Sequence, residues 1–274
     1  MTDTTPTTDA DEERLDPDEQ RSAVRERYSR IASESSSCCD DTSCCDDQSI
    51  DLSKSIGYSE GDLDAVSGNA NLNLGCGNPT AIASLEQGDT VLDLGSGGGF
   101  DCFLAAREVG EEGQVIGVDM TPEMIETARE NVETNAASNV EFRLGEIEHL
   151  PVADESVDVI LSNCVVNLSP DKPQVFRETH RVLRPGGRLA ISDVVLTAEL
   201  PTDLRADPAS VAACVGGAAS IPALEEMLTD AGFADVSVEP KADSDEFIRE
   251  WDSERDLSDY IVAATIEGQK PATG

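Results

Sequence analysis

The stretch Val91-Leu-Asp-Leu-Gly-Ser-Gly-Gly-Gly-Phe100, followed by Gln114-Val-Ile-Gly-Val-Asp-Met120, decides the fold of this chain. An apolar strand over residues 90–94 enters a turn with alternating glycines, and a helical segment and a second apolar strand ending in Asp119 follow. Glycines let the backbone approach a ligand closely, and an acidic residue about 20 positions further on can bind ribose hydroxyls. The pattern therefore predicts a cofactor site built on the turn glycines Gly95, Gly97 and Gly99.

The spacing of these glycines differs from the dinucleotide fingerprint, which has two residues before its third glycine. The Gly-x-Gly-x-Gly spacing, with Asp93 two residues before the first glycine, resembles the class I S-adenosylmethionine-dependent methyltransferases. The resemblance implies S-adenosyl-L-methionine as cofactor, with Asp93 and the glycines beside its methionine part and Asp119 at its ribose. It implies further cofactor-binding residues at Met120, Glu146, Ile147 and Asn163.

Strands and helices alternate from residue 90 onward. The predicted strands are Thr90–Leu94, Gln114–Asp119, Val140–Leu144, Val157–Leu161 and Arg188–Ser192. The predicted helices between them are Phe100–Val109, Pro122–Asn135 and Pro170–Leu183. Right-handed crossovers then give an α/β fold, a doubly wound, mostly parallel, Rossmann-like sheet with helices on both faces.

An α+β segment follows this core. Its predicted helices are 204–215 and 223–231, and its predicted strands are 234–238 and 259–266. We therefore expect three parts: an acidic, Cys-rich N-terminal segment over 1–49, a methyltransferase core with an N-terminal lid over 50–200, and a C-terminal substrate-binding segment over 201–274.

The N-terminal segment has little capacity to form a core of its own. Residues 1–20 are rich in Thr, Asp and Glu and are predicted to be disordered, whereas residues 22–31 have helical spacing and carry several arginines. We expect deletion of residues 1–36 to leave activity largely intact.

The composition excludes several classes of partner. The chain carries 56 acidic and 19 basic residues, a net charge of −37, and only four lysines. Nucleic acid and anionic membranes would repel such a surface, which is typical of salt-adapted proteins. No apolar run approaches the ~18 residues of a membrane span, and the N-terminus has no secretory signal. We expect a cytoplasmic, halophilic monomer without nucleic-acid or membrane partners.

Eight cysteines in such a protein predict reduced thiols, metal or metalloid ligands, or redox chemistry. Cys164 directly follows the fourth strand, at the edge where the cofactor would present its methyl group. Cys76 and Cys214 lie in glycine-bounded loops and are expected to project from them rather than pack, whereas Cys102 is expected to be a small buried hydrophobe. Two pairs lie in a Ser/Asp-rich stretch, Cys38-Cys39 and Cys44-Cys45.

Several cysteine-bearing motifs together resemble the arsenite methyltransferases, from about residue 57 to the C-terminus. They are Leu74-Gly-Cys-Gly-Asn-Pro79, Gly117-Val-Asp-Met-Thr-Pro-Glu-Met124, Gly145-Glu-Ile-Glu-His-Leu-Pro151, Ser162-Asn-Cys-Val-Val-Asn-Leu-Ser-Pro-Asp171 and Cys214-Val-Gly-Gly-Ala218, besides the glycine turn. The resemblance implies that Cys164 and Cys214 bind arsenic as thiolates, and that Cys76 is a further ligand or a redox partner. The family also has a cysteine nearer the N-terminus, and the sequence leaves open which of Cys38, Cys39, Cys44 and Cys45 matches it. Cys44 or Cys45 is a further candidate ligand of the arsenic.

The expected substrate is arsenite or methylarsenite, because soft thiolates select a soft As(III) centre. Methyl transfer from the cofactor to the arsenic lone pair needs no general base, and the sequence shows no evident one. The transfer formally oxidises arsenic, and nearby cysteines can reduce it again by forming a disulfide. A thiol reductant, thioredoxin-like or of low molecular weight, would then reopen that disulfide.

Other polar residues have two interpretations each. His149 lies where related folds bracket adenine, and a solvent-facing role is an equal alternative; His180 is expected to be structural. Asn163 and Asn167 flank Cys164 and either orient ligands or cap the following helix.

Two other functions compete with arsenite methylation. A methyltransferase of a small organic substrate would need an aromatic pocket, but the chain is 4% aromatic. A non-enzymatic metalloid-binding protein would use the N-terminal cysteine pairs and would leave the cofactor motif without a role.

Overall fold

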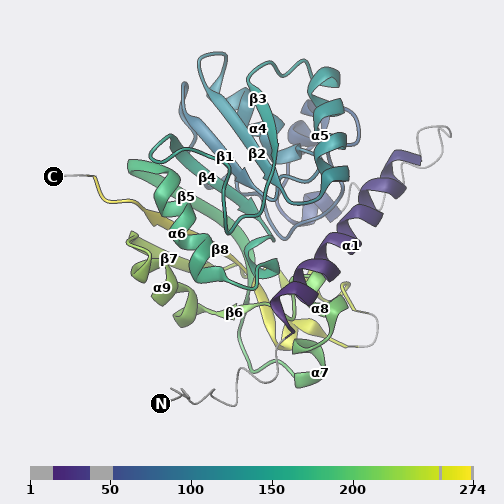
Figure 1. Ribbon diagram of the computed structural model, residues 1–274. Helices are drawn as coiled ribbons and strands as arrows, with labels where there is room; N and C mark the ends of the chain where they lie inside the picture. The colour runs from purple at the N-terminus through teal and green to yellow at the C-terminus, as the bar shows by residue number, and fades with distance from the viewer. Residues whose placement is uncertain (1–14, 38–51, 253–254, 273–274) are drawn as a thin grey trace, which may run out of the picture.

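A computed structural model describes residues 15–37, 52–252 and 255–272 (Figure 1). The four N-terminal cysteines Cys38, Cys39, Cys44 and Cys45 lie outside the described residues, so their predicted roles stay predictions. Among the helices of the described ranges, none combines the length and the apolar character needed to cross a bilayer.

The described strands form one eight-stranded sheet with the order β3-β2-β1-β4-β5-β8-β7, and β6 pairs with β5. Their bounds are β1 (Thr90–Leu94), β2 (Gln114–Asp119), β3 (Val140–Leu144), β4 (Val157–Asn163), β5 (Leu183–Leu196), β6 (Ala219–Ser220), β7 (Ala234–Pro240) and β8 (Ile261–Gln269). Strands β1 to β6 pair in parallel, whereas β8 is antiparallel to both β5 and β7. The predicted mostly parallel α/β fold is confirmed, and the C-terminal strands extend the same sheet.

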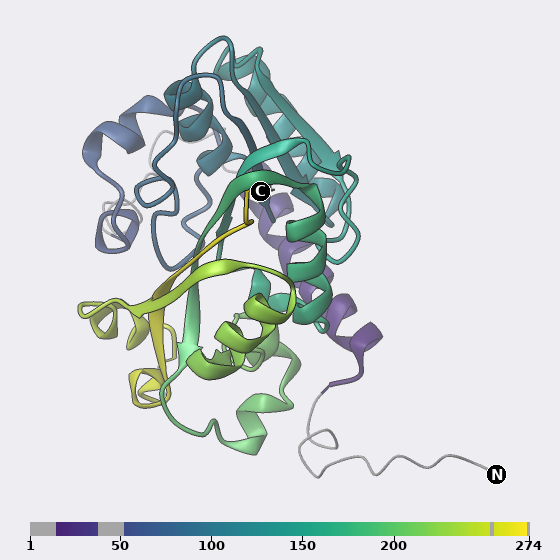
Figure 2. The same ribbon diagram turned by 90° about the vertical axis from the view of Figure 1, so that its left-hand side faces the viewer.

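Helices cover both faces of this sheet. Residues of β1 alternate between the faces: Leu92 and Leu94 join the core under α6 (Lys172–Val182) and α9 (Ile221–Asp230). Val91 joins the core under α4 (Phe100–Val109) and α5 (Pro122–Thr134) on the other face. Figure 2 shows α6 and α9, drawn in green and yellow-green, together on the right-hand side of the sheet. This arrangement is the one that alternating strands and crossover helices predict.

The predicted helix over 204–215 is wrong. Two short helices occupy this stretch, α7 (Thr202–Arg205) and α8 (Pro208–Ala212). Pro208 cannot continue a helix from the preceding turn, and the side chain of Asp207 caps α8 by accepting hydrogen bonds from the amides of residues 209 and 210. The predicted last strand also starts later, at Ile261, because η3 (Leu257–Asp259) precedes it. Two further short elements are α3 (Glu60–Ala65) and α10 (Asp245–Ile248).

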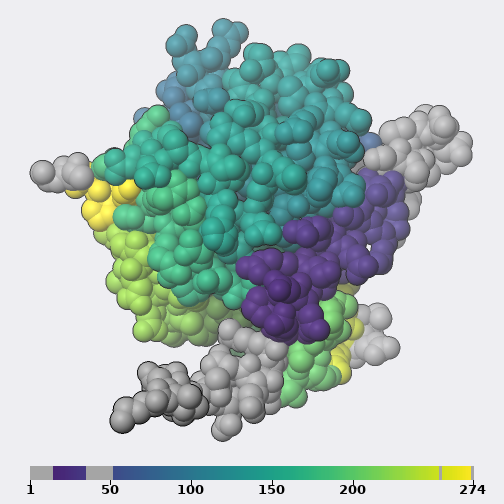
Figure 3. All heavy atoms as spheres, in the orientation of Figure 1, coloured from purple at the N-terminus to yellow at the C-terminus, as the bar shows by residue number. Residues whose placement is uncertain are grey.

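The predicted N-terminal helix is longer than expected: α1 spans Pro17–Ser37. It packs against α5 and α8 and lies across the surface between the core and the C-terminal segment (Figures 1 and 3). Val24 on α1 is only 1% exposed. The apolar side of α1 therefore packs against the body of the protein.

Candidate functional site

A cleft opens at the carboxyl edge of β1, β2 and β4, where parallel sheets of this kind bind ligands. Eight of the residues predicted for the site line it: Asp93, Gly95, Gly97, Asp119, Met120, Ile147, Asn163 and Cys164. The expected position of the cofactor site therefore coincides with a cavity of the structure.

Two residues predicted to bind the cofactor do not line the cleft. Gly99 is the N-cap of α4, and a Cβ there would meet the ring of Phe142 at 2.6 Å, so this glycine serves close packing. Glu146 turns away and pairs with Arg25 of α1 at 3.4 Å, while its neighbours Ile147 and Glu148 line the cleft. The part of the turn that lines the cleft is Gly95, Gly97 and Gly98.

The glycine turn and the end of β2 are joined by hydrogen bonds. Gly97 has a φ of 50°, a left-handed conformation that glycine adopts without strain, and its amide donates to Oδ2 of Asp119 at 3.0 Å. Thr121 donates its amide to Oδ1 of Asp119 at 2.8 Å. A Cβ on Gly97 would meet only Leu72, at 3.9 Å, so the backbone borders open space that a ligand can fill. Burial raises the pKa of Asp119, and the two amide donors oppose that rise.

We expect Asp119→Ala to weaken binding of S-adenosylmethionine by roughly 1.5–3 kcal/mol, the range for hydrogen bonds to charged groups. The reason is that Asp119 is a fixed carboxylate at the cleft with lone pairs left for ligand hydroxyls. Titration calorimetry measures the affinity, and Asp230→Ala, an exposed substitution away from the cleft, is the control. Equal affinity in both variants would contradict the ribose contact.

A buried network connects the cleft to the loop that carries Cys76. The hydroxyl of Tyr58 donates to Asp101 at 2.7 Å, and Nδ2 of Asn163 donates to the Tyr58 oxygen at 3.0 Å. Nδ2 of Asn163 also donates to the Gly77 carbonyl at 2.7 Å, and its Oδ1 accepts from the Cys76 amide at 3.0 Å. Burial raises the pKa of Asp101 to about 6. Asn163 therefore holds this loop against the end of β4, a role that neither of its predicted alternatives includes.

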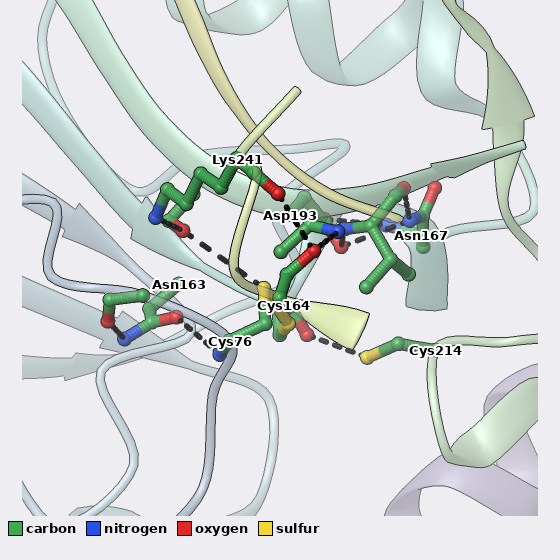
Figure 4. The surroundings of a disulfide bond; sticks show 12 residues. Cys76, Asn163, Cys164, Asn167, Asp193, Cys214 and Lys241 are labelled. Carbon is green, nitrogen blue, oxygen red and sulfur yellow. Dashed lines mark hydrogen bonds between the residues drawn. A yellow bond between two sulfur atoms is a disulfide. The ribbon is translucent and has the colours of Figure 1, made fainter. Parts of the chain in front are cut away.

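Three of the predicted cysteines converge at the end of β4 (Figure 4). Cys76 and Cys164, 88 residues apart, are joined by a disulfide. The thiol of Cys214 donates to the carbonyl oxygen of Cys164 at 2.8 Å. Cys164 lines the cleft and also a second cavity, which Cys214 lines as well. Cys102 stands apart, and its thiol donates to Asp93 at 3.2 Å.

The prediction that Cys76 and Cys214 project from their loops is wrong. Cys76 is 0% and Cys214 is 4% exposed, and Cys164 is 6% exposed. The loop of Cys76 packs against Asn163 and Lys241, and Cys214 follows the end of α8 and lines the second cavity together with Tyr28 of α1. Cys164 and Cys214 have φ values of 56° and 68°, a left-handed conformation that is strained for a residue with a Cβ. Such strain occurs where the surroundings hold a side chain in a required position.

Sequence reasoning missed Asp193, which lies beside the disulfide. Its carboxylate and the sulfurs of Cys76 and Cys164 all lie within 4.8 Å of one another. Asn167 donates its side-chain amide to Asp193 at 2.8 Å and to the Val194 carbonyl at 2.7 Å, so it positions this acid. Burial raises the pKa of Asp193 to about 6. An acid within the apolar run 189–196 was the signal in the sequence.

The two histidines lie outside the site. His180 packs edge-on against Phe233, with ring centroids 5.3 Å apart, which agrees with its predicted structural role. His149 is exposed and does not line the cleft, which favours the solvent-facing alternative.

Helix α1 forms one wall of both cavities. Tyr28 lines both, and Val24 lines the cleft. Gln20 donates to the Leu168 carbonyl at 2.9 Å, and Ser29 donates to Glu123 at 2.8 Å, which fixes the helix across the cleft. The expectation that residues 1–36 are dispensable conflicts with these contacts.

Removal of residues 1–37 is therefore expected to weaken cofactor binding by about tenfold or more, equal to about 1.4 kcal/mol, since one buried apolar wall is lost. Calorimetry on this truncation is compared with a truncation of residues 1–14, which keeps α1. Equal affinity of the two proteins would show that the wall does not contribute.

Comparison with known proteins adds an independent finding. A family model described as "Methyltransferase domain" matches residues 85–232. The arsenite methyltransferase of Halobacterium salinarum is 57% identical over 266 residues, which cover 94% of this chain and 68% of that protein. The arsenite methyltransferase of Aquipseudomonas alcaligenes is 45% identical over 59% of this chain, and the match spans 48% of that relative's length.

A solved structure agrees with these relatives. The crystal structure of an arsenic(III) S-adenosylmethionine methyltransferase from Chlamydomonas reinhardtii superimposes with a TM-score of 0.61 at 34% identity, covering 81% of this chain and 73% of that one.

Proposed function

Because the chain belongs to the arsenite methyltransferase family, we propose that it transfers methyl groups from S-adenosylmethionine to trivalent arsenic held by Cys164 and Cys214. The observation that carries the proposal is the position of Cys164. It lines both the cleft with the glycine turn and the second cavity with Cys214. A ligand on this sulfur therefore borders the cofactor cleft directly.

Thiols bind arsenous acid by replacing its hydroxide groups, with release of one water for each As–S bond formed. Asp193 lies within 4.8 Å of the Cys164 sulfur and is placed to accept the proton that the thiol loses when it binds arsenic. The methyl transfer itself needs no base. Two thiolates leave the arsenic lone pair free, and soft sulfur ligands favour this soft centre. The left-handed φ values of both cysteines are strained, so the fold holds these two backbones in place.

The cofactor supplies an electrophilic methyl group on a sulfonium. The chain's own residues fit such a ligand: the open space at Gly97, the fixed carboxylate of Asp119 and the apolar side chains of Met120 and Ile147 all border the cleft. Helix α1 limits the access of water, and alignment of the reacting atoms is the main source of rate.

The Cys76–Cys164 disulfide supports a role for Cys76 as the redox partner of Cys164 in the reaction. In this proposal, the cysteines return pentavalent arsenic to As(III) by forming the disulfide, and a thiol reductant reopens it. We further propose a cytoplasmic, monomeric enzyme from a salt-adapted organism. Its net charge of −37 and the halobacterial relative support the salt-adapted origin.

The test incubates the reduced protein with arsenite, S-adenosylmethionine and a dithiol at high salt, which shortens the Debye length to ~3 Å at 1 M and screens the acidic surface. We expect methylated arsenic to form, with one S-adenosylhomocysteine released for each methyl group transferred. Arsenite binding without S-adenosylhomocysteine would point to a metalloid-binding protein instead, and turnover only with a small organic acceptor would point to another methyltransferase.

A further inference from the structure

The two sulfurs of the Cys76–Cys164 disulfide have different surroundings. Cys164 borders both cavities, whereas Cys76 is 0% exposed and borders neither. Of the two bonded cysteines, Cys164 is therefore the one that an external thiol in either cavity can approach.

A partly buried lysine lies near Cys76. The Ser192 hydroxyl is 3.9 Å from the Cys76 sulfur, and Nζ of Lys241 donates to that hydroxyl at 2.8 Å (Figure 4). A Cβ on Gly77 would lie 2.0 Å from both the Lys241 nitrogen and the Ser192 oxygen, so both groups press against the loop that carries Cys76. Lys241 follows the end of β7, where its amide bonds to the Ala263 carbonyl at 2.8 Å. This ammonium therefore has a fixed place beside one end of the disulfide.

The nearest carboxylate does not distinguish the two sulfurs. Asp193 lies within 4.8 Å of both, so its negative charge opposes a thiolate on either. Asp101 connects to the Cys76 loop only through Asn163, which donates to it at 3.5 Å. In the part of the chain that the structure describes, the Ser192–Lys241 pair is thus the polar contact specific to the sulfur of Cys76.

We propose that Lys241, acting through Ser192, sets the direction in which the disulfide opens, with Cys76 as the leaving thiolate and Cys164 as the site of attack. An external thiolate attacks the Cys164 sulfur, the S–S bond breaks, and its electron pair goes to the Cys76 sulfur beside the ammonium. A second external thiol then attacks the mixed disulfide, which releases the Cys164 thiolate and an oxidised reductant. Two thiols supply the two electrons.

The purpose of this step rests on the proposed function, because it returns Cys164 to the form that binds arsenic. Lys241 is a positioning residue and makes no contact with the substrate in this proposal. A lower pKa of the leaving thiol speeds thiol–disulfide exchange. A neighbouring cation changes the pKa of an ionisable group by about 1–3 units, so the loss of Lys241 should slow opening roughly 3- to 30-fold.

The experiment uses the oxidised, full-length protein without arsenite. Free thiols are first alkylated, limiting glutathione is added, the reaction is quenched in acid, and newly released thiols are labelled. Peptide mass spectrometry then locates the glutathione. We expect the glutathione on Cys164 and the new label on Cys76. Glutathione on Cys76 of the parent protein would by itself overturn the proposal.

The rate of opening tests the role of the charge. Lys241→Met should slow it roughly 3- to 30-fold, Lys241→Arg should restore it, and Lys54→Met, which removes a surface lysine paired with Glu60, is the matched control. If Lys241→Met does not fold, Ser192→Ala tests the same interaction, because it removes the hydroxyl between Lys241 and the Cys76 sulfur. Equal rates for the Lys241 and Lys54 variants, or no rescue by arginine, would overturn the proposal. Arsenite methylation by the parent protein is measured separately, so a failure of the proposed function is distinguishable from a failure of this one.

Discussion

Replacement of either Cys164 or Cys214 by serine is expected to reduce arsenite methylation by about 100-fold or more, the order of loss when reacting atoms are misplaced. Serine is nearly isosteric with cysteine but is a hard oxygen ligand, which a soft As(III) centre does not favour. In the proposed function the two sulfurs hold one ion, and the Cys214 thiol lies 2.8 Å from the carbonyl oxygen of Cys164. The double variant should therefore be no worse than either single variant, as for residues that act as a unit.

Two measurements accompany this prediction. Affinity for S-adenosylmethionine, measured by calorimetry, should persist in all three variants. Cys102→Ser is the matched control: its buried side chain can still donate to Asp93, and it stands apart from the three converging cysteines. A Cys164→Ser variant that methylates arsenite at the parental rate would refute the arsenic site, and a methyltransferase of a small organic substrate would then be the better account.

Asn163→Leu is expected to lower kcat/KM for arsenite by about 100-fold, because the loop of Cys76 loses its attachment to the end of β4. Leucine keeps the branched shape and the number of side-chain heavy atoms of asparagine but removes the acceptor for the Cys76 amide and the donors to the Gly77 carbonyl and Tyr58. Each buried group left without a partner also costs about 1–3 kcal/mol of stability. Formation of the Cys76–Cys164 disulfide should slow in parallel.

A second asparagine separates this effect from a general loss of stability. Asn139 donates to the carbonyls of Ala106 and Gly110 at 3.2 and 3.0 Å, and it does not line either cavity. Asn139→Leu should lower the melting temperature but leave kcat/KM near the parental value. Similar kinetic losses in both variants would show that Asn163 acts through stability alone.

Local patterns determined the central sheet and the cofactor edge of this protein. The predicted bounds of Thr90–Leu94, Gln114–Asp119 and Phe100–Val109 agree with β1, β2 and α4. Apolar periodicity, helix starts and glycine turns depend on neighbouring residues, and they carry the same meaning in any α/β fold. For the same reason Asp119 could be placed at the cleft from its position at the end of a strand.

Local patterns failed where contacts distant in sequence decide. Gly99 has the right spacing for the cofactor turn, but the rings of two phenylalanines occupy the space beside it. Helix α1 has the composition of an exposed segment, yet Val24 is buried because α5 and α8 supply its partners.

Only the tertiary structure decided the geometry of the proposed arsenic site. The sequence identified Cys76, Cys164 and Cys214 through a family resemblance, but segments 88 and 50 residues apart had to meet before their disulfide and thiol contacts existed. Asp193 and Lys241 could not be assigned from local sequence, since an acid in a strand and a lysine after one have no chemical role until the fold places them within reach of a sulfur. Burial then raises the pKa of Asp193, and partial burial lowers the pKa of Lys241, because loss of water disfavours the charged form of each group.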